Sequence, residues 1–395
     1  MTRTERRRAR PRRAGLAVAL AVTAFVACTS AGARNGSTDR AASTPASSPA
    51  PSPSAAPSAS GQPHRDPAQI ALARRKIDHV VFIVKENRTF DTLFGRFPGA
   101  DGTRVGVTCD GRTVPLRRAR LDSPGANHSF LSGVLAVNGG RMNCFDQVSG
   151  GQQLGGYIQY APEQIPAYWR LARRFTLADR FFSSSYGPTF VEHMFVIAAQ
   201  SDRYVDNERA TTDQIGTDGV VGGYCDDPTE RVFSFPLLTS AQTARIYDLE
   251  EQARVDDIRS TWIQRWPSDD IRTVPDLLQR DEISWRYYTT NSPYYQALKT
   301  IPHIRYGPMW RHVVDESTFI PDVRAGRLPS VAWLIPPTWE SDHPDLGNLC
   351  DGENWTVRTL DAVMRSPAWR STAVFLTWDD FGGFYDHVPS PHVDI

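Results

Sequence analysis

The chain has 395 residues, with 44 basic and 44 acidic side chains, so its formal net charge is zero. This length suffices for one large domain or two ordinary ones. The balanced charge argues against a nucleic-acid-binding protein, because that function depends on Lys and Arg neutralising phosphates. No GxGxxG or Walker-type loop occurs, so the sequence does not indicate a nucleotide cofactor.

Residues 1–28 have the composition of an export signal. Seven arginines within the first 13 residues precede an apolar stretch, Leu16 to Ala27, that is short for a membrane span. Residues 25–28, Phe-Val-Ala-Cys, resemble a bacterial lipobox, in which Cys28 becomes a lipidated first residue. A plainly cleaved signal is the alternative. We therefore expect an exported protein that is either secreted or held at the cell surface through Cys28.

Residues 29–70 are rich in Ser, Ala, Pro and Gly and contain few large apolar side chains. Such a segment cannot bury enough surface to offset its ordering entropy, so it is predicted to be a disordered tether. Residues 71–395 are then expected to form the folded domain.

Four cysteines remain beyond the signal, and an even number is typical of disulfide bonding outside the cytoplasm. They allow two disulfides in three possible pairings, and their spacing does not fit a CxxC zinc site. Buried free thiols are the alternative. The four are Cys109, Cys144, Cys225 and Cys350.

Apolar runs typical of buried strands alternate with helical patterns along the domain. This alternation predicts an α/β fold with a mainly parallel sheet covered on both sides. The strands are expected at Ile77–Val84, Ser284–Tyr288, Val331–Ile335 and Thr372–Thr377. The helices are expected at Ala167–Arg174, Val191–Gln200, Val274–Gln279 and Trp355–Met364.

Polar side chains follow two of these strands at their carboxyl ends. Glu86 and Asn87 follow the first strand, and Asp379 and Asp380 follow the last. Active sites of parallel sheets lie beyond this edge. Three carboxylates gathered there would repel one another without a cation, and such oxygen ligands suit a divalent metal ion. The loop after the third strand brings His343 to the same edge.

Thr189 follows a Gly-Pro turn and stands at the start of a predicted helix. A hydroxyl at a helix amino terminus that also touched a metal would lose its proton more easily and could attack phosphorus. The alternative is that Thr189 only caps the helix. The nearby Ser183, Ser184 and Ser185 are other candidate nucleophiles.

The order of several motifs resembles that of the bacterial phosphoesterase family, which groups phosphatidylcholine-type phospholipases C with a metal-dependent acid phosphatase. These motifs are VKENRTFDTLFG, NGGRMNCFD, LADRFFSSSYGPT, ISWRYY, SDHP and TWDDFGGFYDHV, within residues 76–391. The resemblance implies an alkaline-phosphatase-like sandwich around a central, mostly parallel sheet. It also implies hydrolysis of phosphoric esters with the help of a divalent metal ion.

The resemblance carries roles to individual residues. Metal binding is implied for Glu86, Asn87, Asp379 and Asp380, with Asn87 also contacting the phosphate. Catalysis is implied for Thr189 as the nucleophile and for His128, His343 and His387.

The sequence departs from the family pattern in two places. Where the family usually has Pro-Asn-His or Pro-Asn-Arg, this chain has Val191-Glu192-His193, which makes His193 a candidate for substrate binding. The pattern also stops at Ile395 before the segment that continues it in the family, so we expect the domain to be truncated.

The function predicted from the sequence is that of an exported phospholipase C-type hydrolase acting on a phosphodiester such as a phospholipid. A phosphomonoesterase of the same fold is one alternative, and a non-catalytic surface lipoprotein is another. Five tryptophans are expected in loops, where they could form a choline cage, a lipid-facing rim or ordinary packing. They are Trp262, Trp266, Trp310, Trp339 and Trp355.

Overall fold

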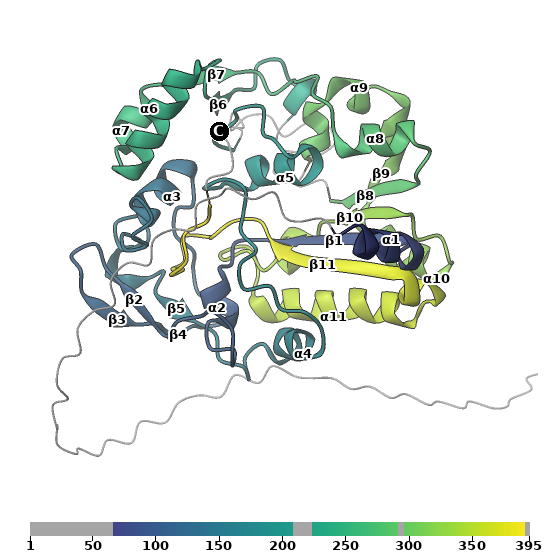
Figure 1. The fold of residues 1–395 in the computed structure, drawn as a ribbon, viewed down its shortest axis with the longest axis horizontal. Coiled ribbons are helices and arrows are strands. Elements are labelled where there is room, and N and C mark those ends of the chain that lie inside the picture. Colours follow the sequence, from purple (N-terminus) through teal and green to yellow (C-terminus); the bar gives the residue numbers. More distant parts are fainter. Residues whose placement is uncertain (1–65, 208–222, 291–295, 392–395) are drawn as a thin grey trace, which may run out of the picture. The chain divides into compact units, whose positions relative to one another are not determined.

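The computed structural model describes residues 66–207, 223–290 and 296–391 (Figure 1). The predicted export signal and most of the predicted tether lie outside these residues. The helices are α1 Pro67–Lys76, α2 Phe90–Phe94, α3 Phe130–Val137, α4 Pro166–Arg174, α5 Thr189–Ala198, α6 Ser240–Glu251, α7 Val255–Arg259, α8 Val274–Arg280, α9 Pro302–Arg305, α10 Phe319–Arg324 and α11 Leu349–Arg365. The strands are β1 His79–Lys85, β2 Val105–Val107, β3 Thr113–Pro115, β4 Arg117–Arg118, β5 Ile158–Gln159, β6 Val232–Ser234, β7 Ile263–Arg265, β8 Trp285–Thr289, β9 Val313–Asp315, β10 Val331–Leu334 and β11 Thr372–Trp378.

Five strands form the central sheet, in the order β11-β1-β10-β8-β9, and every neighbouring pair is parallel. The four strands predicted from the sequence are β1, β8, β10 and β11, so the predicted α/β fold with a mostly parallel sheet is confirmed. The likeness to alkaline phosphatase and the truncated carboxyl-terminal part stay predictions.

The helical predictions hold with shifted boundaries. Helix α11 begins at Leu349 rather than at Trp355, because the side chain of Asn348 caps it by accepting a hydrogen bond from the backbone of Asp351. Residues 67–70, which we had included in the tether, already belong to α1. None of the helices in the described ranges is long and apolar enough to cross a membrane.

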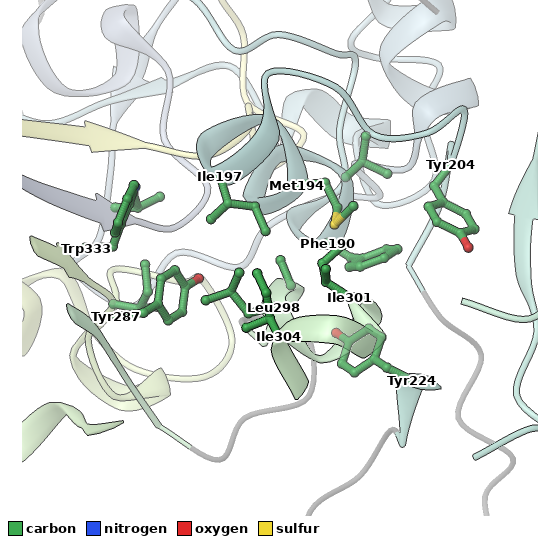
Figure 2. Packing of buried hydrophobic residues seen from close by; sticks show 14 of the residues in the cluster. Phe190, Met194, Ile197, Tyr204, Tyr224, Tyr287, Leu298, Ile301, Ile304 and Trp333 are labelled. Carbon is green, nitrogen blue, oxygen red and sulfur yellow. The ribbon is translucent and has the colours of Figure 1, made fainter. Parts of the chain in front are cut away.

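The two faces of the sheet bury separate cores because side chains alternate along each strand. On one face, Val81 and Ile83 of β1 pack in a cluster with residues of α11. On the other face, Val84 packs in a cluster that includes α5. Figure 1 shows α11 along one side of the sheet and α5 and α8 on the other. Figure 2 shows Met194 and Ile197 of α5 packed in the latter cluster with residues of β8 and β10.

The register between β1 and β11 determines where their polar tips lie. Lys85 is paired with Trp378, so the next residues, Glu86 and Asp379, are side by side. The backbone N–H of Asp379 donates a hydrogen bond of 2.9 Å to the carbonyl of Lys85 and continues the ladder past the last strand residue. The two acidic tips therefore meet, as the sequence predicted.

The cysteine pairing differs from the prediction that the four cysteines form two disulfides with one another. Cys109 and Cys144 are bonded, with a sequence separation of 35. Cys225 is a free, buried thiol, so it forms no second disulfide with Cys350. Burial among apolar neighbours raises the pKa of the Cys225 thiol and makes it a poor nucleophile.

This pairing predicts a labelling pattern. When the denatured, unreduced protein is treated with a thiol reagent, we expect Cys225 to be modified and Cys109 and Cys144 to be protected. Replacing both bonded cysteines by serine should lower the free energy of unfolding by about 4 kcal/mol in the chain-entropy model. Mass spectrometry of the labelled peptides and denaturant titration give the two measurements. Modification of Cys109 in the unreduced protein would contradict the pairing.

Candidate active site

The tips of β1 and β11 form one hydrogen-bonded cluster. The backbone N–H of Asn87 donates to Asp379 Oδ1 at 2.9 Å, and the Asn87 side-chain amide donates to Asp380 Oδ1 at 2.5 Å. Asn87 has a left-handed backbone (φ 59°), and Gly382 lies against it so closely that a Cβ at Gly382 would be 2.6 Å from the Asn87 carbonyl. The chain thus folds back over the cluster because residue 382 is glycine.

The cluster is buried and rich in oxygen atoms without hydrogen-bond donors. Within the described ranges, these atoms are Glu86 Oε1, Asn87 Oδ1, Asp379 Oδ2 and Asp380 Oδ2. Burial raises the pKa of Glu86 to about 8, and burial together with the charges of Glu86 and Asp380 raises the pKa of Asp379 well above its usual range. Buried carboxylates of this kind need a compensating positive charge, so the residues fit a hard divalent cation.

His193, on the second turn of α5, faces these carboxylates. Its Nε2 lies 3.5 Å from Glu86 Oε1, and ligand atoms of Glu86, His193 and Asp379 all lie within 4.8 Å of one another. Burial lowers the pKa of His193 to about 4, so its ring is neutral and able to coordinate a metal. The sequence predicted a substrate contact for His193, and the structure places it among the candidate metal ligands.

Thr189 is the first residue of α5, and its hydroxyl donates a 3.1 Å hydrogen bond to Glu86 Oε2. The N-cap of the helix is Pro188, and no side chain caps it. The alternative that Thr189 is only an N-cap is therefore wrong. Its hydroxyl is directed to the carboxylate cluster, with 3% of the residue exposed.

The loop of candidate serines lies beside the same helix. Glu192 of α5 accepts hydrogen bonds from the backbone N–H groups of Ser184 and Ser185, at 3.1 and 2.8 Å. Glu192 is buried, and burial raises its pKa well above the usual range. Glu192 stands where the family pattern usually has asparagine. Its contacts hold this loop against α5.

His128 and His343 lie together, with ring centroids 5.9 Å apart. Burial would lower the pKa of His128, but the negative charges of Asp380 and Asp379 and the hydrogen bond with the Ala126 carbonyl together outweigh burial, and the pKa is raised. Burial lowers the pKa of His343. The two rings thus form a pair with opposite pKa shifts close to Asp380.

His387 lies in a different set of contacts. Its Nδ1 is 2.7 Å from Asp91 Oδ2, and its Nε2 is 3.3 Å from Asp101 Oδ1. Ligand atoms of Asp91, Asp386 and His387 are near enough to hold a metal ion, but both carboxylates already accept backbone hydrogen bonds. No contact in the described ranges joins His387 to Glu86 or Asp379, so the structure does not bring it to the first cluster.

Sequence reasoning missed a buried ion pair beneath the site. Lys85, the last residue of β1, is fully buried, and its Nζ lies 3.4 Å from Asp342 Oδ1. Nζ also donates to the backbone carbonyls of Glu340 and Gly352, at 2.7 and 2.9 Å. Asp342 directly precedes His343, so this pair holds the loop that carries the histidine. A lysine ending a strand was the available signal, but its partner lies far away in sequence.

A cavity of about 120 Å³ lies next to the cluster. Its lining includes Asp379, Asp380 and Arg88 as well as the aromatic residues Phe90 and Phe145. The five tryptophans do not gather there. Trp355 belongs to α11 and is buried, Trp262 packs against Phe130, and Trp339 is 63% exposed.

Comparison with known proteins gives a consistent result. A model of the Phosphoesterase family matches residues 77–395. The chain is 26% identical to Phospholipase C A of Mycobacterium tuberculosis over 361 residues, which cover 80% of this chain and 60% of the relative. It is 25% identical to Non-hemolytic phospholipase C of Pseudomonas aeruginosa, over 80% of this chain and 43% of the relative.

A plant protein is similar as well. Non-specific phospholipase C6 of Arabidopsis thaliana is 23% identical, over 81% of this chain and 56% of the relative. The chain thus spans 60% or less of the length of these three curated relatives.

The contacts of His387 predict a pH-dependent stability. Burial alone would lower the pKa of His387, but its hydrogen bond to Asp91 and the negative charge there raise it to about 9. A raised histidine pKa contributes stability that is complete below about pH 6.5 and is lost as pH rises towards 9. Burial also raises the pKa of Asp386 to about 7, but the stability that this shift contributes is lost between about pH 4 and pH 7, so Asp386 adds little to the change above pH 7.

We therefore expect the melting temperature to fall between pH 6.5 and pH 9.5, and to fall less in a His387→Gln variant. The difference between the two proteins should be at most about 3 kcal/mol, and largest at the lower pH. Thermal denaturation of both proteins across this range is the measurement. Parallel curves for the two proteins would show that the His387–Asp91 contact does not contribute.

Proposed function

The chain belongs to the Phosphoesterase family, and we propose that it is an exported, metal-dependent hydrolase that cleaves phosphodiesters in the manner of a phospholipase C. The observation that carries this proposal is the hydrogen bond from the Thr189 hydroxyl to Glu86, within a buried cluster of oxygen ligands at two strand ends. The names of the relatives support the reaction class.

Glu86 and Asp379 would hold the metal ion, with His193 as a nitrogen ligand and with Asn87 and Asp380 completing the oxygen set. Their hydrogen-bond-free oxygens support this assignment. A divalent cation bound there would neutralise part of the buried negative charge and polarise a phosphoryl oxygen. The metal's identity is left to experiment, because carboxylates, an amide and an imidazole suit several first-row ions.

Thr189 is the proposed nucleophile. Its hydroxyl oxygen attacks phosphorus, the bond to the leaving alcohol breaks, and water later releases the phosphoryl group from the threonine. Two contacts favour Thr189 over the serines of the adjacent loop. Its hydroxyl reaches Glu86 directly, whereas Ser184 and Ser185 contact Glu192 through their backbones.

His128 and His343 are proposed to act in proton transfer to and from the leaving group. The raised pKa of His128 favours the protonated ring, which can donate a hydrogen bond to a phosphoryl oxygen or a proton to the departing alkoxide. His343, with a lowered pKa, is neutral and can accept a proton. His387 is proposed to position the carboxyl-terminal loop rather than to touch substrate.

The substrate is proposed to be a phospholipid or a similar phosphodiester, and Cys28 is proposed to anchor the protein to a membrane through a lipid. The presence of Phe90 and Phe145 in the cavity lining supports a substrate that has an apolar group as well as a phosphate. Comparing turnover of phosphatidylcholine with that of a nitrophenyl monoester separates this proposal from a phosphomonoesterase. Turnover of neither would favour a non-catalytic surface lipoprotein.

The ligand assignment makes a prediction about metal content. Asp379→Asn and Asp380→Asn should each lower the bound divalent metal and reduce phosphodiester turnover by orders of magnitude, because a neutral amide is a weaker ligand than a carboxylate. The fold should persist, since the substitution keeps the side-chain shape. Elemental analysis and circular dichroism of the purified variants check both points. Undiminished metal in both variants would remove these residues from the ligand set.

The nucleophile assignment predicts different outcomes for two substitutions. Thr189→Ala should abolish turnover while metal content and melting temperature stay near those of the wild type, and Thr189→Ser should remain active because it keeps the hydroxyl. Ser185→Ala is the matched control and should stay active. If the folded Thr189→Ala variant retains more than about a tenth of wild-type turnover, the nucleophile is another residue.

A further inference from the structure

Among the residues that the structure describes, Arg88 is a buried cation without an anionic partner. It directly follows Asn87, and only 5% of it is exposed. Its Nη1 donates a 3.0 Å hydrogen bond to the carbonyl of Asn87, but its Nε is buried without any acceptor. Throughout the described ranges, no carboxylate lies within ion-pair distance of Arg88. Buried arginines are almost always paired, since leaving their donors unsatisfied is costly.

The location of Arg88 suggests what the missing partner is. Arg88 lines the same cavity as Asp379 and Asp380, the proposed metal ligands. Its guanidinium lies over the ring of Phe384, 4.9 Å from the centroid. Its positive charge also contributes to lowering the pKa of His343, after burial and the charge of His128, so it acts on one of the proposed catalytic histidines.

The negative charges of the site and of its substrate call for a positively charged group such as Arg88. Glu86, Asp379 and Asp380 carry up to three negative charges when ionised, and a divalent cation offsets two of them. A phosphodiester brings one further negative charge into this buried place, and a phosphomonoester brings about two. A guanidinium stays protonated at any physiological pH and presents parallel N–H donors that match two phosphoryl oxygens.

We propose that Arg88 binds the phosphoryl group of the substrate, with its free guanidinium N–H groups donating hydrogen bonds to the non-bridging oxygens. This inference rests on the proposed function, which assigned no role to Arg88. It adds to the active site a fixed positive charge that the protein itself supplies next to the metal ligands.

The competing explanation is that Arg88 serves only the packing around Phe384. Arg173 of α4, which is exposed, is a control for the contact between a guanidinium and an aromatic ring. Its guanidinium also lies over an aromatic ring of the same apolar cluster, 5.5 Å from the centroid of Trp169, but it does not line the cavity. A packing role predicts that substitutions at both positions leave phosphate affinity unchanged, whereas a phosphoryl-binding role predicts a loss of affinity at Arg88 alone.

The test uses the full chain with its bound metal and inorganic phosphate as the probe. Calorimetric titration should show that Arg88→Met weakens phosphate binding by about 10-fold to 100-fold, the range expected for a lost hydrogen bond to a charged group. Arg88→Lys should weaken phosphate binding less, because lysine keeps the positive charge although it loses the parallel N–H donors of the guanidinium. Arg173→Met should bind phosphate as the wild type does. Wild-type affinity in a folded Arg88→Met variant would overturn the inference.

Two further readouts keep the inference testable. If Arg88→Met does not fold, Arg88→Lys decides, and wild-type phosphate affinity in that variant would overturn the role of the guanidinium. With phosphatidylcholine or a nitrophenyl ester as substrate, kcat/KM should fall in the Arg88 variants and stay unchanged in Arg173→Met, which distinguishes substrate phosphate from free phosphate as the ligand.

The outcomes for the two proposals are separable. A wild-type protein that hydrolyses no phosphoester contradicts the proposed function but leaves the phosphate titration of the Arg88 variants decisive for the anion site. A hydrolytically active protein whose phosphate affinity does not depend on Arg88 contradicts this inference and leaves the proposed function standing.

Discussion

The pairing of β1 with β11 brings like charges together where water cannot separate them, and the rest of the site depends on this constraint. Glu86 and Asp379 are neighbours because the register of two parallel strands makes them so. Their oxygens are buried, and several accept no hydrogen bond from the described chain. An arrangement of this kind is costly unless a cation occupies it. The hydroxyl of Thr189 and the ring of His193 then approach the same carboxylates from α5.

A second buried pair supports the site from below. Lys85 and Asp342 connect the end of β1 to the loop before α11, and Asp342 also accepts hydrogen bonds from Tyr168 and from Trp378 of β11. Removing one partner of a buried pair typically costs 3–5 kcal/mol, roughly a third or more of a domain's total stability. The strand that presents Glu86 and the loop that carries His343 are therefore held together by residues that need no contact with substrate.

The sequence was sufficient for features that repeat locally. Runs of β-branched residues predicted the strands, and polar residues after them predicted that Glu86 and Asp379 would meet. Contacts between residues far apart in the sequence could not be predicted. The charge of Lys85 at a strand end did not reveal its partner, because pairing across hundreds of residues follows from packing rather than from periodicity. For the same reason the sequence did not reveal that the ring of His387 contacts Asp91, and an even cysteine count suggested a bond that Cys225 does not make.

The position of β11 at the edge of the sheet has a consequence for how the protein folds. The hydrogen bond between Asn87 and Asp379 joins residues 292 positions apart, so the two halves of the ligand cluster meet only after a very large loop has closed. Contacts of this range form slowly, because the entropy of loop closure is lost before any contact compensates for it. A partly synthesised chain therefore carries Glu86 and Asn87 without Asp379 and Asp380. The cation site, and any hydrolytic activity that depends on it, arises late, once the last strand has docked against the first.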